Sequence, residues 1–420
     1  MRERLERAGG PGILLVDTTR YRVHDCVPRC VAAPRSADEA AAVLALCSAE
    51  GWTVECAGTG SHLANGGRAP KRVDVVITAA RMHGIAEYEP SDMTMAALAG
   101  TPLFVLQATT VPHRQAAPFD APDGSLGATI ACVRDGPLRT SIGTPRDNVL
   151  GLEAVSGDGR VLRFGGRVVK NVAGYDLVRL LIGSRGTLAF ITRAHFRLRA
   201  RPSNDETCVI AGPRSELVSA AQRVGVVLPA ALELMPDADA EAWRLYVRLR
   251  GSAEEVRYAR EQLSALVAGL QPIASSVATT LWLTLHAQES AAPVMVRLAA
   301  APAHLDRTLA CALHLAARAD RITSAPGLPD GWSAAAHAND GIVRVWRDRP
   351  AADQTALADA VLRAREEMRE IGGTVHVPTA SALPPDVVAW PVDEISLGIM
   401  RTLKQALDPA GILAPGRFVT

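Results

Sequence analysis

Hydrophobic and polar positions along the chain predict a protein of mixed α and β structure. A short strand pattern ends at Pro34, and apolar residues then recur at helical spacing between Ser36, a side chain typical of helix N-caps, and Gly51. A second strand pattern at 52–57 leads into a glycine-rich loop at 58–67. We therefore expect the order strand, helix, strand, glycine loop at the start of the fold.

The next hundred residues predict further short elements. Residues 73–100 contain two or three strand patterns. The segment that follows them is expected to form a short helix capped by Thr101. Small residues at 124–131 indicate a second tight turn, and Gly157–Gly159 is typical of a β-hairpin. These patterns extend the first α+β region.

The stretch from Gly165 to Ile191 has glycines at close intervals between two apolar runs. Leucines at helical spacing stand before Gly183 and Gly186, and an alternating pattern follows them. We interpret the stretch as loop, short helix, tight turn and buried strand, with the glycine turn facing a ligand. A plain helix–turn–strand connection is an equally good reading of this stretch alone.

From residue 206 a strand-like piece followed by a helical piece occurs three times. This rhythm predicts an antiparallel sheet covered by helices. We therefore divide the chain into an α+β domain at 1–205, with two lobes that meet near residue 100, and a second α+β domain at 206–371. The final segment, 372–420, predicts a helix and then a tail rich in proline and glycine, which is more turn chemistry than a fraying end requires.

Composition excludes several classes of function. The chain has 420 residues, 48% of them hydrophobic, which is enough for two cores. A net charge of +1 provides no field for nucleic acid or anionic membranes, and no apolar run reaches the length of a membrane span. We expect a cytoplasmic protein with no direct membrane insertion, associated with a membrane only through partners.

Seven cysteines without paired spacing argue for a reducing compartment and against a disulfide framework. Cys26 and Cys30 could bind a metal only with ligands from elsewhere in the chain, and their role stays open.

The loop at Gly58–His62 has the clearest candidate chemistry. Its glycines leave successive backbone amides uncovered, and Thr59 and Ser61 add hydroxyl groups, a combination that suits a pyrophosphate. The loop lacks both the spacing and the following helix of a doubly wound dinucleotide site or a P-loop. A glycine-rich connection between strands is the alternative reading.

Beyond these patterns, the chain resembles FAD flavoproteins of the vanillyl-alcohol oxidase type across nearly its whole length. Within that superfamily it is most similar to the small FAD-binding subunit of bacterial glycolate oxidase. The matching segments, in chain order, are YEPSDMTMAALAGTPLFVLQ, PFDAP, GATIA, GPLRTSIGTPRDNVLG, RFGGRVVKNVAGYDLVRLLIGSRGTL and LKQALDPAGILAPGR.

The resemblance implies a two-lobed FAD-binding domain of the PCMH type, an α+β cap domain and a C-terminal segment that returns to the FAD domain. It also implies that four regions of this chain contact the FAD. The implied cofactor residues are Gly58, Thr59, Gly60, Ser61, His62, Gly127, Ala128, Thr129, Ala131, Gly136, Arg139, Gly143, Gly186 and Ile191.

Some relatives bind the flavin covalently through a histidine in the first of these loops. Here His62 stands one residue beyond that place, so the resemblance implies non-covalent FAD. Three positions depart from the family pattern, namely Ala128, Ala189 and Ala414.

The resemblance also implies an oxidoreductase that acts on 2-hydroxy acids together with a larger FAD-linked catalytic subunit and an iron–sulfur subunit. Catalytic members carry an HxGDGNxH-like cluster in the cap, and none of the ten histidines here stands in such a context. His286 with Glu289, and His376, are the remaining histidine candidates, and we assign no catalytic residue and no metal site.

Two alternatives stay open. A self-sufficient flavin oxidase or dehydrogenase would need an arginine for the substrate carboxylate, and Arg139, Arg146 and Arg417 are candidates that serve equally well as phosphate contacts or surface charges. A structural subunit that has lost its flavin is the other alternative.

Overall fold

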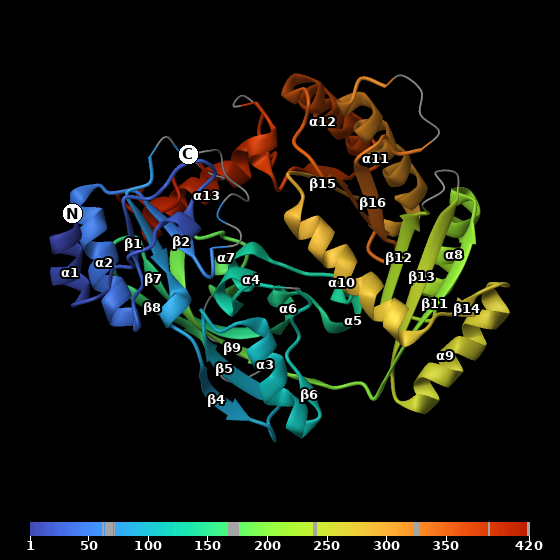
Figure 1. Ribbon diagram of the computed structural model, residues 1–420, viewed down its shortest axis with the longest axis horizontal. Helices are drawn as coiled ribbons and strands as arrows, with labels where there is room; N and C mark the ends of the chain where they lie inside the picture. The colour runs from blue at the N-terminus through green and yellow to red at the C-terminus, as the bar shows by residue number, and fades with distance from the viewer. Residues whose placement is uncertain are drawn as a thin grey trace. The chain divides into compact units, whose positions relative to one another are not determined.

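The structure is a computed structural model, and it describes residues 1–60, 63, 70, 72–121, 123–166, 176–237, 242–322, 327–384 and 387–417. The chain forms two compact units (Figure 1). Unit 1 comprises Met1–Asp135, Gly143–Arg201 and Val392–Thr420, and unit 2 comprises Gly136–Ile142 and Pro202–Pro391.

The first lobe of unit 1 is built on a parallel sheet of three strands in the order β1-β3-β2. The strands are β1 (Cys30–Ala32), β2 (Val54–Ala57) and β3 (Val75–Thr78), with helices α1 (Arg2–Gly9) and α2 (Ala37–Glu50). Ser36 caps α2 by accepting from the Glu39 amide, and Gly51 ends the helix in a left-handed conformation. The predicted order of strand, helix and strand is thus confirmed, and of the loop at 58–67 only Gly58–Gly60 and Leu63 lie among the described residues.

The second lobe is an antiparallel sheet of five strands in the order β4-β5-β9-β7-β8. The strands are β4 (Ile85–Glu89), β5 (Thr94–Leu98), β7 (Val149–Ser156), β8 (Val161–Gly165) and β9 (Ala189–Arg197), and β6 (Gln115–Ala116) pairs with β10 (Arg199–Ala200). The remaining helices of unit 1 are α3 (Leu103–Thr110), α4 (Leu126–Cys132), α6 (Pro145–Asn148), α7 (Val178–Leu181) and α13 (Glu394–Leu407), with short 3₁₀ turns at Thr19–Tyr21, Ala79–Arg81 and Val111–His113.

Both lobes share one hydrophobic core. Val75 and Ile77 of the parallel sheet belong to the same buried cluster as Ala97 and Phe196 of the antiparallel sheet. The ring of Phe119 meets that of Phe196 edge to face at 5.0 Å. The two lobes therefore form one packed body, which places their facing loops close together.

Unit 2 is built on an antiparallel sheet of eight strands in the order β14-β11-β13-β12-β16-β17-β15-β18. The strands are β11 (Asn204–Gly212), β12 (Ala231–Pro236), β13 (Trp243–Gly251), β14 (Gln271–Pro272), β15 (Val294–Ala299), β16 (Trp332–His337), β17 (Ile342–Arg347) and β18 (Thr374–His376). The helices are α5 (Arg139–Ile142), α8 (Arg214–Gly225), α9 (Ala253–Leu266), α10 (Ser275–Ala291), α11 (Leu305–Ala319) and α12 (Gln354–Arg369), with 3₁₀ turns at Pro302–His304 and Ala380–Ala382.

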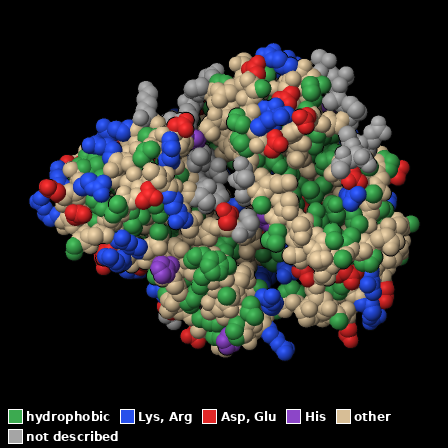
Figure 2. All heavy atoms as spheres, in the orientation of Figure 1, with side chains coloured by type: hydrophobic (Ala, Val, Ile, Leu, Met, Phe, Trp, Pro, Cys, Tyr) green, Lys and Arg blue, Asp and Glu red, His purple; other side chains and the backbone are tan. Residues whose placement is uncertain are grey.

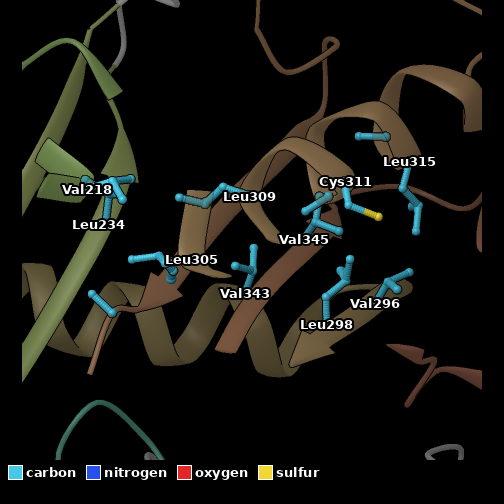
Figure 3. Packing of buried hydrophobic residues seen from close by; sticks show 14 of the residues in the cluster. Val218, Leu234, Val296, Leu298, Leu305, Leu309, Cys311, Leu315, Val343 and Val345 are labelled. Carbon is cyan, nitrogen blue, oxygen red and sulfur yellow. The ribbon is translucent and has the colours of Figure 1, made fainter. Parts of the chain in front are cut away.

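The strands of unit 2 place alternate side chains in two different cores. Val343 and Val345 pack with Leu305, Leu309 and other residues of α8, α9, α11 and α12 (Figure 3). The intervening and flanking side chains point the other way, and Trp346 packs with residues of α10 in a separate cluster. This arrangement confirms the predicted antiparallel sheet covered by helices.

Two local predictions were wrong. Thr101 does not cap α3, whose N-cap is Pro102; instead the Thr101 hydroxyl is buried and bonded to both backbone groups of Gly84. The small residues at 124–131 form helix α4 rather than a tight turn, because Gly127 lets this helix lie against Ala99, where a β-carbon would come within 2.8 Å of the alanine methyl.

The division of the chain into domains at 206 and 372 stays a prediction. Contacts within the structure separate the units at Pro202 and return the chain to unit 1 at Val392. They also assign Gly136–Ile142 to unit 2, a placement that no local pattern indicates.

On the face shown in Figure 2, basic and acidic side chains are interspersed over the surface, in keeping with the small net charge. Within the described part of the chain, no helix combines the length and apolarity needed to cross a membrane.

Candidate functional site

A recess in unit 1 collects residues from the end of β2, helix α4, the turn before β9 and the C-terminal tail. It encloses about 600 Å³ when its open mouth is included. Its lining residues are Cys56, Ala57, Gly58, Thr59, Gly60, Leu63, Ala79, Ala99, Ser125, Gly127, Ala128, Ala131, Cys132, Arg185, Gly186, Ala189, Phe190, Ile191 and Arg417. Segments far apart in sequence, such as those of Leu63 and Arg417, therefore meet at one site.

The glycine loop after β2 forms one wall of the recess. The Gly58 carbonyl accepts from the Thr78 hydroxyl at 2.6 Å, and the Thr59 carbonyl accepts from Arg20 Nε at 3.1 Å. A β-carbon at Gly58 would lie 2.1 Å from the Ser125 hydroxyl oxygen. Gly60 has φ +90°, a conformation that other residues rarely adopt. Glycine is therefore required at both positions, because Gly58 has no space for a β-carbon and Gly60 has a positive φ.

Helix α4 forms another part of the lining and brings small side chains to the recess. The Leu126 and Gly127 amides donate to the Thr101 and Ala99 carbonyls, so the first turn of the helix is tied to the end of β5. The hydroxyl oxygens of Ser125 and Thr129 are fully buried and have no hydrogen-bond partner within the described part of the chain. Buried hydroxyls of this kind normally have a partner, and Ser125 lines the recess, so a polar ligand there would satisfy it.

The turn at Gly183–Gly186 is fastened to α4. The Gly183 amide donates to the Ile130 carbonyl and the Arg185 amide donates to the Ala131 carbonyl. Gly186 has φ +74°, and a β-carbon there would lie 2.7 Å from the β-carbon of Cys56. The turn thus holds the start of β9 against both α4 and β2.

We expect Gly186→Val to lower both FAD affinity and thermal stability, because the side chain would collide with Cys56 and strain a left-handed backbone. Flavin fluorescence titration and thermal melting of the FAD-free chain measure the two effects separately. Gly51→Val is the control, since Gly51 has φ +63° and a β-carbon added there would meet no atom within 4 Å. Normal melting together with normal FAD binding would show that the turn is peripheral.

Burial controls the protonation of the groups beside the recess. Burial raises the pKa of the Cys56 thiol to about 12, and the nearby Glu55 carboxylate adds to the rise. Cys56 is therefore a neutral thiol at physiological pH, and it donates weakly to the Gly186 carbonyl at 3.6 Å. Burial also raises the pKa of Glu55, while the charges of Arg417 and Lys404 oppose the rise.

The structure brings most of the predicted cofactor residues together as lining of the recess, namely Gly58, Thr59, Gly60, Gly127, Ala128, Ala131, Gly186 and Ile191. Thr129 is buried in α4 without lining it. Ser61 and His62 lie outside the described residues. Gly143, with φ +80°, lies between α5 and α6 and is not part of the lining.

Gly136 and Arg139 belong to unit 2. Arg139 Nε lies 2.9 Å from Asp340 Oδ2, so this arginine has a carboxylate partner inside that unit. His286 is on α10, while the Glu289 side chain lies outside the described residues. His376 is on β18, with its ring centroid 6.4 Å from that of Trp390.

All seven cysteines, including Cys26 and Cys30, are free. Among the described residues, no three histidine, cysteine or acidic side chains are grouped closely enough to hold a metal ion.

A buried polar cluster in unit 2 had no local signal in the sequence. Glu233, on β12, is fully buried and accepts from Arg344 Nη2, on β17, at 2.7 Å. His337 Nδ1, at the end of β16, lies against the other carboxylate oxygen. These side chains come from three adjacent strands, so only the order of the strands in the sheet reveals the cluster.

We expect Glu233→Leu to destabilise unit 2 by about 3 to 5 kcal/mol, because Arg344 would remain buried without its carboxylate. Tryptophan fluorescence during denaturant unfolding measures this loss, since five of the six tryptophans belong to unit 2. Glu261→Ala, which removes an exposed pair with Arg257, should cost less than about 1 kcal/mol. Equal losses in the two variants would contradict a structural role for the cluster.

The residues that line the recess suit the chemical groups of an FAD molecule. An extended dinucleotide needs close backbone approach, which the glycine loop and α4 provide, and an apolar surface for a ring system, which Phe190, Ile191 and the alanines provide. The Ser125 hydroxyl, which has no hydrogen-bond partner among the described residues, is available for a polar contact with the ligand.

Comparisons with known proteins find an FAD-binding domain in the chain. Residues 28–165 match the family described as FAD binding domain. The chain is 41% identical to glycolate oxidase subunit GlcE of Escherichia coli over 123 residues, which cover 28% of this chain and 35% of that protein. It is 30% identical to glycolate oxidase subunit GlcD of Bacillus subtilis over 255 residues, 56% of this chain and 53% of that protein. The matches thus span about half the length of these relatives or less.

The fold also has a solved counterpart. A crystal structure of p-cresol methylhydroxylase with substrate bound superposes with a TM-score of 0.76 at 16% identity, covering 99% of this chain and 95% of the other. The predicted similarity to glycolate oxidase subunits, the FAD-binding domain and the FAD cofactor are confirmed. The predicted α+β fold is confirmed as well.

Proposed function

Because the chain carries an FAD-binding domain and is homologous to glycolate oxidase subunits, we propose that it is the FAD-binding subunit of a complex that oxidises a 2-hydroxy acid. The recess in unit 1 carries this proposal, since its glycine loop, helix α4 and Gly186 turn all converge on one cavity inside the matched domain or directly beside it in space. Glycolate is the simplest acid of this class.

The residues of this chain bind and orient the cofactor. Backbone groups of Gly58–Gly60 would hold the pyrophosphate, while Ala128, Phe190 and Ile191 would line the flavin ring and keep water away from it. FAD, when bound, supplies the capacity to accept electrons and to pass them on. We expect the cofactor to be held without a covalent bond.

In this proposal the chain relays electrons to an iron–sulfur subunit, and a larger FAD-linked subunit holds the substrate. The similarity to subunits GlcE and GlcD supports an assembly of several chains. The complex would lie in the cytoplasm and would contact a membrane only through its other subunits.

A self-sufficient oxidase or dehydrogenase is the second candidate. It would need a general base close to the flavin. His286 and His376 are the histidine candidates that the sequence offers for this base.

A structural subunit without flavin is the third candidate, motivated by alanine at positions 128 and 189. Both alanines line the recess, and Ala189 lies at the start of β9, 2% exposed. Their methyl groups leave the recess open, which argues for retained FAD binding.

An absorbance spectrum of the purified chain, before and after adding glycolate, tests these candidates. Yellow protein that glycolate fails to bleach supports the relay subunit. Yellow protein that glycolate bleaches supports the self-sufficient enzyme. Colourless protein that does not take up added FAD would overturn the first two candidates together.

A further inference from the structure

The C-terminal tail covers the free edge of strand β2. The Val54 amide donates to the Ile412 carbonyl and the Ala414 amide donates to the Val54 carbonyl, each at 2.8 Å, so Leu413 pairs with Val54 in parallel. β2 is an edge strand of its sheet, and the tail supplies the missing neighbour. The tail therefore runs in the same direction as β2, toward the glycine loop.

Two charged side chains fix the tail in this place. Asp408, 1% exposed, accepts from the Ile412 and Leu413 amides, and it receives Lys404 Nζ at 2.6 Å. Lys404 Nζ also donates to the Thr187 carbonyl at 2.8 Å, one residue after the Gly186 turn. Lys404 and Asp408 thus hold the tail in position ahead of Arg417, the tail residue that lines the recess.

Arg417 is the residue that the tail delivers to the recess. It is 5% exposed, and its Nη2 donates to the Leu63 carbonyl at 2.6 Å. The same nitrogen lies 3.1 Å from Glu55 Oε2, and Glu55 is 3% exposed. A guanidinium this deeply buried is stable only with such partners.

Leu63 connects this arginine to the glycine loop. Its side chain is 4% exposed and packs with Tyr21, Val73 and their neighbours, while its carbonyl is held by Arg417. The backbone is therefore fastened at Leu63 and, through the Thr78 hydroxyl, at Gly58. Gly60 lies between these two points and faces the recess.

We propose that Arg417 is a positioning residue for the FAD loop, so that cofactor retention depends on the C-terminal tail. The guanidinium acts by holding the Leu63 carbonyl, which keeps the amides of the glycine loop directed at the recess. This inference rests on the proposed FAD site in unit 1, and it assigns to the tail a task in cofactor binding.

The test compares two arginines in matched surroundings. Arg417→Met removes the charge and the donor while keeping an apolar chain of similar length. Arg347→Met is the control, because Arg347 is also 5% exposed, donates to one carbonyl (Pro350) and pairs with one carboxylate, Asp320 at 3.2 Å, but lies in unit 2. Arg417→Lys is the conservative variant.

FAD dissociation constants are measured by quenching of flavin fluorescence on the FAD-free chains. We expect Arg417→Met to weaken FAD binding about tenfold to a hundredfold, as for the loss of a hydrogen bond from a charged donor. Arg417→Lys should recover part of this loss, and Arg347→Met should leave FAD affinity within about twofold of the parent, although both Met variants melt at lower temperature.

Hydrogen exchange of a peptide spanning 58–66 in the FAD-free chains provides a second readout, which does not depend on cofactor binding. Exchange should be faster in Arg417→Lys and Arg417→Met and unchanged in Arg347→Met. FAD affinity or loop exchange in the Arg417 variants equal to the parent would overturn the positioning role. Failure of the parent chain to bind FAD would instead overturn the proposed function, while the exchange data would still decide whether Arg417 holds the loop.

Discussion

Replacing Gly60 with valine should abolish flavin retention while leaving the chain folded. Gly60 has φ +90°, and a β-carbon there would lie 3.2 Å from the Arg20 carbonyl oxygen and 3.3 Å from the Tyr21 ring. A β-branched residue must leave this conformation, since left-handed backbone costs an L-residue about 1 to 2 kcal/mol even before crowding. The loop backbone would then no longer keep the conformation in which it lines the recess.

The measurement is the flavin absorbance of the purified variant after gel filtration, together with circular dichroism for folding. Gly10→Val is a matched control, because Gly10 has φ +93° in the same unit but no atom within 4 Å of the place that a β-carbon would take. We expect this control to lose some stability and to stay yellow. A folded Gly60→Val protein with full yellow colour would show that the loop does not bind the cofactor.

Reduction of the bound flavin by glycolate or D-lactate should be much slower in the isolated chain than in the assembled complex. The relay proposal leaves the substrate to a larger subunit, and the cap of this chain lacks the HxGDGNxH-like pattern of catalytic relatives. Acid–base assistance of the kind such a cluster provides typically contributes about 10² to 10⁴ in rate.

Stopped-flow mixing of the FAD-loaded chain with either acid, followed at the flavin band, tests this expectation. Complete bleaching within seconds at millimolar acid would contradict the relay proposal and favour the self-sufficient enzyme. In that event His376→Gln and His286→Gln would identify the base, because the variant that removes it should slow bleaching without lowering FAD affinity.

Local elements could be predicted from the sequence where one short pattern carries all the information. The helix between Ser36 and Gly51 has its cap and its glycine end in sequence, and the structure has both. The hairpin at Gly157–Gly159 joins β7 to β8 as expected, because left-handed glycine favours that turn. Helix α13 and the glycine turn before β9 were likewise predicted from local sequence patterns, and both are present in the structure.

Tertiary packing overruled the local pattern at two places. The residues around Gly127 look like a turn, but they form α4 because the helix packs against Ala99 and ties its first amides to β5. Thr101 has the side chain of an N-cap, yet the buried backbone of Gly84 takes its hydroxyl. In both cases a contact with a residue distant in sequence replaced the local structure that the pattern predicts.

By itself the sequence determined the alternation of elements, the glycine positions that demand unusual backbone and the segments that resemble FAD flavoproteins. These are local properties, set by side-chain size and by the backbone angles that glycine allows. The three-dimensional structure alone decided which charges meet. Glu55 joins Arg417, Glu233 joins Arg344, and Arg139 joins Asp340, each across a long stretch of chain. The physical reason is that a buried charge requires a partner, and only the packing of sheets and tail determines which one lies within reach.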